Sequence, residues 1–283
     1  GTLIQDSPVG FAGGTLSGSS KRTENAVWKP VWGKRAEVPD RFNEVTLDLK
    51  TYRLVARAYD DGVAFRCLGG AGAELTQFRF AGDYTAWFYN GEHHNLGPEK
   101  LSESDGKRMP PMTVKAADDA YLAVLEADLG NGDPLALQTK KGETAFSVAS
   151  KPSEAWRVLL FGRTPGAMVD SHLIELLNPP PAEGMDFSWV KPGVAVWDWR
   201  INGAQVDGFK YEMSYPSWKR MVDFAAENNI RYLVLDADWY GKEFNPKSDP
   251  TNGGYAGDAK KLIVYAKGKG VGVWLYLNDV AGR

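Results

Sequence analysis

Acidic and aromatic side chains follow short apolar runs at three places in the second half of the chain. The residues concerned are Asp198, Trp199, Asp236, Asp238, Trp239, Asn278 and Asp279. Carboxylates and amides form hydrogen bonds with hydroxyl groups, and the face of an indole ring packs against the apolar side of a sugar. These residue types therefore favour a site that holds a polyhydroxylated ligand such as a carbohydrate.

Each acid also has a simpler interpretation, because an Asp after a strand is often only a turn former or a helix cap. Two features favour ligand contact at the second run: Asp236 and Asp238 flank a single residue, and Trp239 follows at once. Hydrolysis of a glycosidic bond needs two carboxyl groups placed across that bond. The acids at the strand ends are candidates, but the sequence does not show that any two of them have that spacing.

Strands and helices alternate in the segment that must position these residues. Apolar runs predict strands at 192–197, 232–235 and 271–277. Apolar side chains at helical spacing predict a helix from Pro216 to Asn229, and a second helix is predicted from about Asp258 to Lys267. This βαβαβ order indicates a parallel sheet, in which the carboxyl ends of the strands meet at one edge.

The spacing of these strands indicates a barrel that is incomplete in this chain. Strand starts near Val194, Tyr232 and Val271 lie about 40 residues apart, so eight units would need on the order of 300 residues, compared with about 250 in a usual barrel. The chain after Gly193 has room for three such units. We therefore predict the first three βα units of a (β/α)8 TIM barrel.

The first half of the chain has the pattern of short antiparallel strands. Asp60-Asp61-Gly62 joins two alternating segments in a predicted hairpin, and a second hairpin is predicted from 134–139 to 144–148. Regular short strands with few helices are typical of an antiparallel sandwich. The proline-rich segment 178–184 separates the two patterns. We predict a sandwich domain at 1–180, with its start apparently missing, and the beginning of a barrel at 181–283.

One acid interrupts an otherwise apolar strand in the first half. Glu126 lies within the predicted strand Tyr121–Leu129. A buried carboxylate must be paired, protonated or bound to a metal ion. From the local sequence, structural pairing and metal ligation are equally good explanations.

Composition excludes several classes of partner. A net charge of -3 and a pI near 5.8 provide no basic surface for nucleic acid or an anionic membrane. No apolar run is long enough for a membrane span, and no signal-like stretch follows Gly1. Dinucleotide, P-loop, serine-hydrolase and zinc motifs are absent from the sequence.

The whole chain resembles glycoside hydrolase family 97. Five ordered blocks carry the resemblance: 122–129, 155–159 together with 171–179, 196–200, 218–226 and 232–239. Members of the family pair an N-terminal β-super-sandwich with a (β/α)8 barrel. The resemblance implies an exo-acting α-glycosidase that removes terminal galactosyl or glucosyl residues from the non-reducing end of oligo- or polysaccharides, and a periplasmic or extracellular location.

The resemblance also implies roles for individual residues. Asp236, Asp238 and Trp239 match the acids and tryptophan that hold sugar hydroxyls, and Glu126 matches a glutamate that the sandwich supplies to a calcium ion. The segment Trp197-Asp198-Trp199 looks closer to the retaining α-galactosidase branch than to the inverting α-glucosidases. The catalytic carboxylates of the family lie on later strands, so we expect them C-terminal to Arg283 and name none in this chain.

A second hypothesis is that the chain as it stands is a catalytically inactive carbohydrate-binding or structural fragment. A barrel that ends after three strands has an open parallel edge. Such an edge is expected to pair with another chain, because its backbone donors and acceptors are unpaired.

Overall fold

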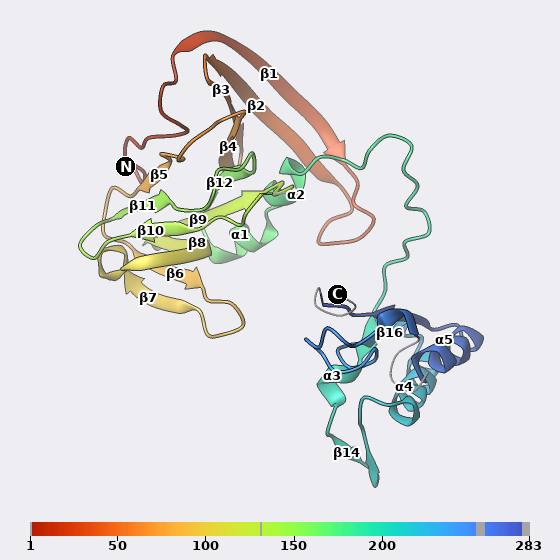
Figure 1. Ribbon diagram of the computed structural model, residues 1–283. Helices are drawn as coiled ribbons and strands as arrows, with labels where there is room; N and C mark the ends of the chain where they lie inside the picture. Colours follow the sequence, from red (N-terminus) through yellow and green to blue (C-terminus); the bar gives the residue numbers. More distant parts are fainter. Residues whose placement is uncertain (1, 131, 253–257, 279–283) are drawn as a thin grey trace. The chain divides into compact units, whose positions relative to one another are not determined.

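The structure is a computed structural model that describes residues 2–130, 132–252 and 258–278. The chain forms two compact units, Gly1–Met185 and Asp186–Arg283. Among the described residues, no helix is long and apolar enough to cross a membrane. Figure 1 gives the labels of the helices and strands.

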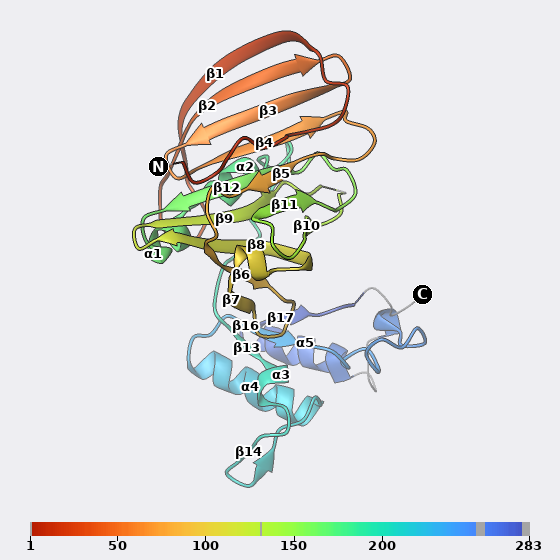
Figure 2. The same ribbon diagram turned by 90° about the vertical axis from the view of Figure 1, so that its left-hand side faces the viewer.

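The first unit is mostly antiparallel sheet with few helices, as predicted for this half of the chain. Its strands are β1 (Leu16–Trp28), β2 (Val38–Leu49), β3 (Tyr52–Tyr59), β4 (Gly62–Leu68), β5 (Gln77–Arg79), β6 (Thr85–Tyr89), β7 (Leu96–Lys100), β8 (Gly106–Ala117), β9 (Ala120–Ala127), β10 (Leu137–Thr139), β11 (Ala145–Val148) and β12 (Trp156–Gly162). The helices are η1 (Leu101–Glu103), α1 (Pro165–Asp170) and α2 (Leu173–Leu177). The strand order is β1-β2-β3-β4-β12-β9-β8-β10-β11-β5, and β6 pairs with β8 and β7 (Figure 2).

Strand β8 changes partners along its length and so joins two parts of this sheet. Residues 106–108 pair with β10, whereas later residues pair with β6 and β9. Pro110 and Pro111 lie at a register shift in the pairing with β6, where the missing backbone donors interrupt the ladder. Large side chains such as Phe78, Phe88 and Phe146 are fully buried between the two parts and form the main core.

Both predicted hairpins are present in the first unit. Strands β3 and β4 pair across the turn at Asp60 and Asp61, and β10 pairs with β11 across residues 140–144. Helix α2 buries Leu173 and Leu177 in a cluster with Trp156 of β12. This helix therefore covers part of one face of the sheet.

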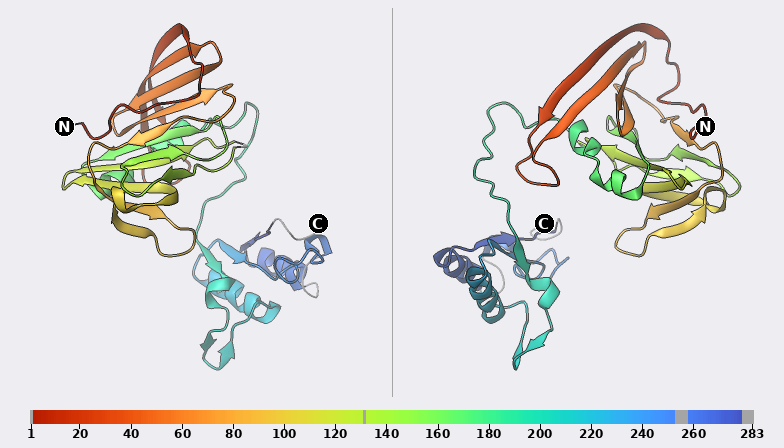
Figure 3. Two further views of the ribbon diagram at one scale, coloured as in Figure 1. Left: turned by 60° about the vertical axis from the view of Figure 1, so that its left-hand side comes forward. Right: turned by 180° about the vertical axis from the view of Figure 1, so that it is seen from behind.

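The second unit has a three-stranded parallel sheet with two long helices packed on it (Figure 3). Its elements are β13 (Ala195–Trp197), α3 (Asp198–Ile201), β14 (Gln205–Val206), β15 (Phe209–Lys210), α4 (Tyr215–Glu227), β16 (Tyr232–Leu235), η2 (Pro250–Asn252), α5 (Asp258–Gly268) and β17 (Gly272–Leu275). The strand order is β13-β16-β17. Trp218 of α4 and Leu262 of α5 are fully buried against Leu233 of β16.

The prediction of β16, α4 and α5 is confirmed, with bounds within two residues of those expected. Strands β13 and β17 are shorter than predicted, since β13 begins at Ala195 and β17 ends at Leu275. Both pair only with β16, which has four residues and limits the ladder on each side. The described residues contain three parallel strands, and the complete barrel stays a prediction.

Candidate functional site

Asp236 follows β16 directly and lies half-buried at the carboxyl end of the parallel sheet. Its Oδ2 accepts a hydrogen bond of 2.7 Å from Nε1 of Trp197, and its Oδ1 accepts one of 2.7 Å from the backbone N–H of Ala237. The parallel pairing of Trp197 with Val234 brings the two strand ends together. A carboxylate has about four lone-pair positions, so both oxygens of Asp236 can still accept from ligand hydroxyls.

Asp198, the first residue of α3 directly after β13, supports the backbone of Asp236. Its Oδ1 accepts the backbone N–H of Asp236 at 2.9 Å, and its Oδ2 accepts Nε1 of Trp218 at 2.8 Å. Only 2% of Asp198 is exposed. Burial raises the pKa of Asp198 to about 6, although these hydrogen bonds oppose the shift. Asp198 therefore positions Asp236, and its predicted contact with a sugar stays a prediction.

Asp238 and Trp239 shape the loop after β16 in different ways. Asp238 has a φ of 70°, in the left-handed region, and its Oδ1 accepts the backbone N–H of Glu243 at 2.8 Å. Trp239 is 4% exposed, and its Nε1 donates to the carbonyl oxygen of Tyr276 at 2.6 Å. The indole of Trp239 thus ties this loop to the chain after β17 and offers no open ring face. Its predicted contact with a sugar stays a prediction.

Exposed indoles are available beside the buried ones. Trp199 is 48% exposed and Trp197 is 39% exposed, and the guanidinium of Arg200 lies 4.8 Å from the ring centroid of Trp197. Asn278 donates through Nδ2 to the hydroxyl of Tyr240 at 2.8 Å. The structure therefore brings Trp197, Asp198 and Asp236 into one hydrogen-bonded group, with Asn278 in a second group beside Tyr240. Asp279 lies outside the described residues.

Glu126 lies in the first unit, half-buried on β9. Its Oε2 accepts the backbone N–H of Leu135 at 2.7 Å. Burial raises its pKa, and Leu135 and Arg157 oppose the shift. Calcium takes 6–8 oxygen ligands, whereas the described residues contain no group of three or more acidic, His or Cys side chains that could hold a metal ion. Glu126 alone does not form a calcium site.

Several contributors to the strand-end network were not predicted as site residues. Trp218 was expected as part of the apolar face of a helix, and Trp197 as the last residue of a strand and part of the segment that resembles the retaining α-galactosidase branch. The available signal was their type: an indole has one N–H donor, and a buried indole usually donates it. Neighbouring acids at a predicted strand end are suitable acceptors, but the pairing depends on how α4 packs on the sheet.

Comparison with known proteins gives a consistent result across the chain. Residues 1–180 match a family model described as Glycosyl-hydrolase 97 N-terminal, and residues 197–281 match one described as Glycoside hydrolase 97. A retaining alpha-galactosidase of Bacteroides thetaiotaomicron is 26% identical over 92% of this chain and 47% of its own length. A probable retaining alpha-galactosidase of Streptomyces bingchenggensis is 27% identical over 99% of this chain and 48% of its own. The chain spans about half the length of these relatives.

Solved structures share the fold. A Glycoside Hydrolase Family 97 enzyme from Pseudoalteromonas sp. strain K8, in complex with acarbose, has a TM-score of 0.76 at 23% identity, over 96% of this chain and 49% of its own. A variant of a family 97 enzyme from the same strain, in complex with panose, gives the same values. A GH36 alpha-galactosidase variant of Geobacillus stearothermophilus has a TM-score of 0.55 at 12% identity, over 93% of this chain and 43% of its own.

Proposed function

This chain belongs to glycoside hydrolase family 97, and we propose that it takes part in the hydrolysis of terminal α-linked galactosyl residues, with retention of configuration. Two relatives named as retaining or probable retaining alpha-galactosidases support galactose over glucose. The substrate would be an oligo- or polysaccharide with an α-linked sugar at its non-reducing end. Solved family 97 enzymes in complex with acarbose and panose support a sugar ligand of this kind.

The observation that carries the proposal is the arrangement of Asp236 at the end of β16. Its carboxylate is oriented by Trp197 and supported by buried Asp198, and it keeps lone pairs for hydroxyl groups of a sugar. Asp238, also half-buried after the same strand, is a second acceptor. These acids hold and orient the sugar, and the groups that break the glycosidic bond are proposed to lie beyond Arg283, on later strands of a (β/α)8 barrel.

Glu126 is proposed to supply one oxygen to a calcium ion in the complete enzyme. Its Oε2 already receives the Leu135 N–H, which fixes the carboxylate in place. The other ligands would come from outside the described residues, because these contain no group of three or more acidic, His or Cys side chains that could hold a metal ion. A periplasmic or extracellular location is proposed from the family alone, and fractionation of the source cells tests it.

The test is an assay of the intact gene product on aryl α-galactoside and aryl α-glucoside, with and without a chelator. We expect turnover of the galactoside, loss of activity with the chelator, and kcat/KM lowered about 10- to 100-fold by Asp236→Asn, because a charged acceptor for hydroxyls is lost. The matched control is Asp186→Asn, since Asp186 is exposed and, within the part of the chain that the structure describes, its side chain bonds to Ser188 alone. Absence of turnover on both substrates would contradict the proposal.

A second candidate applies to the chain as it stands: a non-hydrolysing, carbohydrate-binding or structural fragment. Three parallel strands without the later barrel strands support it, because the proposed catalytic acids are not among them. The open edge of this sheet is proposed to pair with another chain. We expect no hydrolysis by the 283-residue chain, and measurable turnover would overturn this candidate. Native mass spectrometry distinguishes a single 31.1 kDa species from a paired one.

A further inference from the structure

A ladder of guanidinium groups and aromatic rings crosses one face of the sheet in the first unit. Its members are Arg22 of β1, Phe42 of β2, Arg57 of β3, Trp156 of β12 and Arg66 of β4. Arg22 and Arg57 lie 4.8 and 4.4 Å from the ring centroid of Phe42, and Arg57 and Arg66 lie 4.8 and 4.6 Å from that of Trp156. Phe42 and Trp156 are buried, so the ladder is a fixed surface.

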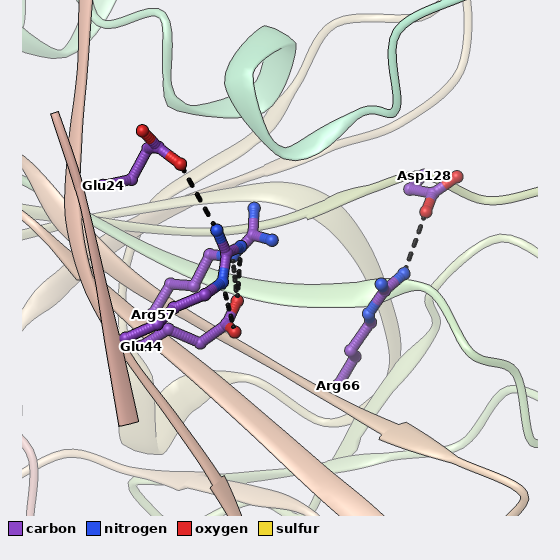
Figure 4. Close-up of polar contacts among 6 residues, drawn as sticks. Glu24, Glu44, Arg57, Arg66 and Asp128 are labelled. Carbon is purple, nitrogen blue, oxygen red and sulfur yellow. Dashed lines mark hydrogen bonds and ion pairs between the residues drawn. The ribbon is translucent and has the colours of Figure 1, made fainter. Parts of the chain in front are cut away.

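Carboxylates hold the guanidinium groups of this ladder in place. Glu44 accepts two hydrogen bonds from Arg22, at 2.8 and 3.1 Å, and one of 2.7 Å from Arg57. Arg66 donates through Nη1 to Asp128 at 3.0 Å. Figure 4 shows Arg57 beside Glu44 and Arg66 reaching Asp128. Each arginine is thereby oriented before any ligand arrives, which lowers the entropic cost of binding.

A pocket of about 750 Å³ lies over the ladder. The ladder lines it on one side, and the end of α2 with the following prolines, 176–181, lines it on another. Trp28, at the end of β1, also lines it and is 40% exposed. The volume lies within the range of about 300–1,000 Å³ that is typical of small-molecule sites.

Arg66 and Asp40 supply a donor and an acceptor to the lining of this pocket. The Arg66 side chain is 26% exposed, and Asp40 is half-buried. A ligand with both donors and acceptors can therefore form hydrogen bonds with this lining. A hydroxyl group has both functions in one atom.

The charge of the lining selects among ligands. Three arginines line the pocket, but so do four acids: Glu24, Asp40, Asp128 and Glu175. An anion finds no surplus of positive charge there, and two of the four acids, Glu24 and Asp128, are already held by arginines. An exposed indole beside alternating donors and acceptors suits a neutral polyhydroxylated ring.

We propose that this pocket of the first unit is a non-catalytic binding site for a neutral oligosaccharide. The proposal stands independently of hydrolysis, because every residue that carries it lies in the first unit. The apolar face of one sugar ring would pack on Trp28. Its hydroxyls would accept from Arg66 and donate to Asp40.

The test is isothermal titration of the 283-residue chain with maltose and with melibiose. Hydrogen exchange locates the bound sugar. We expect saturable binding with a Kd on the order of 1 mM and slower exchange in peptides covering 24–28 and 172–178. Trp28→Ala should weaken binding about tenfold, the loss of one stacking contact. The control is Trp32→Ala, because Trp32 is 76% exposed in the next loop and does not line the pocket.

A second variant protects the test against misfolding of the first. Asp40→Asn keeps the size of the side chain and replaces one acceptor oxygen with a donor, so it should also weaken binding about tenfold. Equal affinity in wild type, Trp28→Ala and Asp40→Asn would overturn the proposal, as would the absence of saturable binding. Inorganic phosphate or glucuronate binding tighter than maltose and melibiose would overturn the neutral sugar in favour of an anion.

Discussion

Asp198 in the second unit and Glu44 in the first are both largely buried acids, but their hydrogen-bond donors differ in charge. Asp198 receives the backbone N–H of Asp236 and the indole N–H of Trp218, which are neutral. Glu44 receives the guanidinium groups of Arg22 and Arg57. Burial raises the pKa of Asp198 to about 6. At Glu44 burial acts in the same direction, but the two arginines outweigh it and lower the pKa.

The difference shows that neutral donors fix the position of a carboxylate without fixing its charge. Each oxygen of Asp198 accepts a hydrogen bond, yet its protonation changes near pH 6, within the range of ordinary buffers. Glu44 remains ionised throughout that range because cations stabilise its charged form. A network of the first kind can position Asp236 and still respond to pH, whereas the ladder of the first unit is insensitive to it.

The largest expected effect comes from removing Asp198. In Asp198→Ala, the backbone N–H of Asp236 and Nε1 of Trp218 lose their acceptor in a buried place, at about 1–3 kcal/mol each. We expect the second unit to lose about 2–5 kcal/mol of stability. Urea-dependent hydrogen exchange in peptides covering 215–240 measures it. Asp186→Ala, on the surface of the same unit, is the control, and equal losses in both variants would contradict the supporting role of Asp198.

The next effect is the pH dependence that Asp198 imposes on its unit. Its pKa is about 6 in the folded chain and about 3.9 when unfolded, so the folded state binds more protons between these values. The contribution of Asp198 to the unfolding free energy of the second unit is complete below about pH 4 and is lost as pH rises through about 6. This contribution amounts in total to about 2–3 kcal/mol. In Asp198→Asn this contribution is absent. The difference in unfolding free energy between wild type and variant should therefore shrink from pH 4 to pH 7.5, and a constant difference would refute the shift.

The comparison also shows what the sequence can and cannot predict. Strand β16 was predicted to its end residues because a short apolar run between polar residues has few alternatives. The burial of Asp198 was not predicted, because it depends on the indole of Trp218 reaching across from α4. Likewise Arg57 alternates with Ala56 and Ala58, and Arg22 lies in a polar run, so the sequence indicates a solvent-facing side for both. Only the pairing of β1, β2 and β3 shows that they stack on Phe42.

The smallest expected effect comes from removing the charge of Glu44 in the first unit. Glu44→Gln keeps one acceptor oxygen but removes the charge shared by Arg22 and Arg57, and Arg57 is only 16% exposed. We expect a loss of about 1–2 kcal/mol at pH 7, since hydrogen bonds between charged groups are stronger than neutral ones. Because the folded pKa of Glu44 is lowered, this contribution is present above the unfolded pKa and is lost as pH falls, opposite in sign to Asp198.

The control is Asp119→Asn, which breaks the ion pair between Asp119 and Arg163. These two side chains are 76% and 77% exposed, so the variant should change stability by less than about 0.5 kcal/mol. Urea unfolding of the wild type and the two variants at pH 3 and pH 7 measures these free energies. If Glu44→Gln loses no more stability than Asp119→Asn at pH 7, the arginines do not hold Glu44 as a fixed charge. Glu44 and Asp198 would then differ in burial alone.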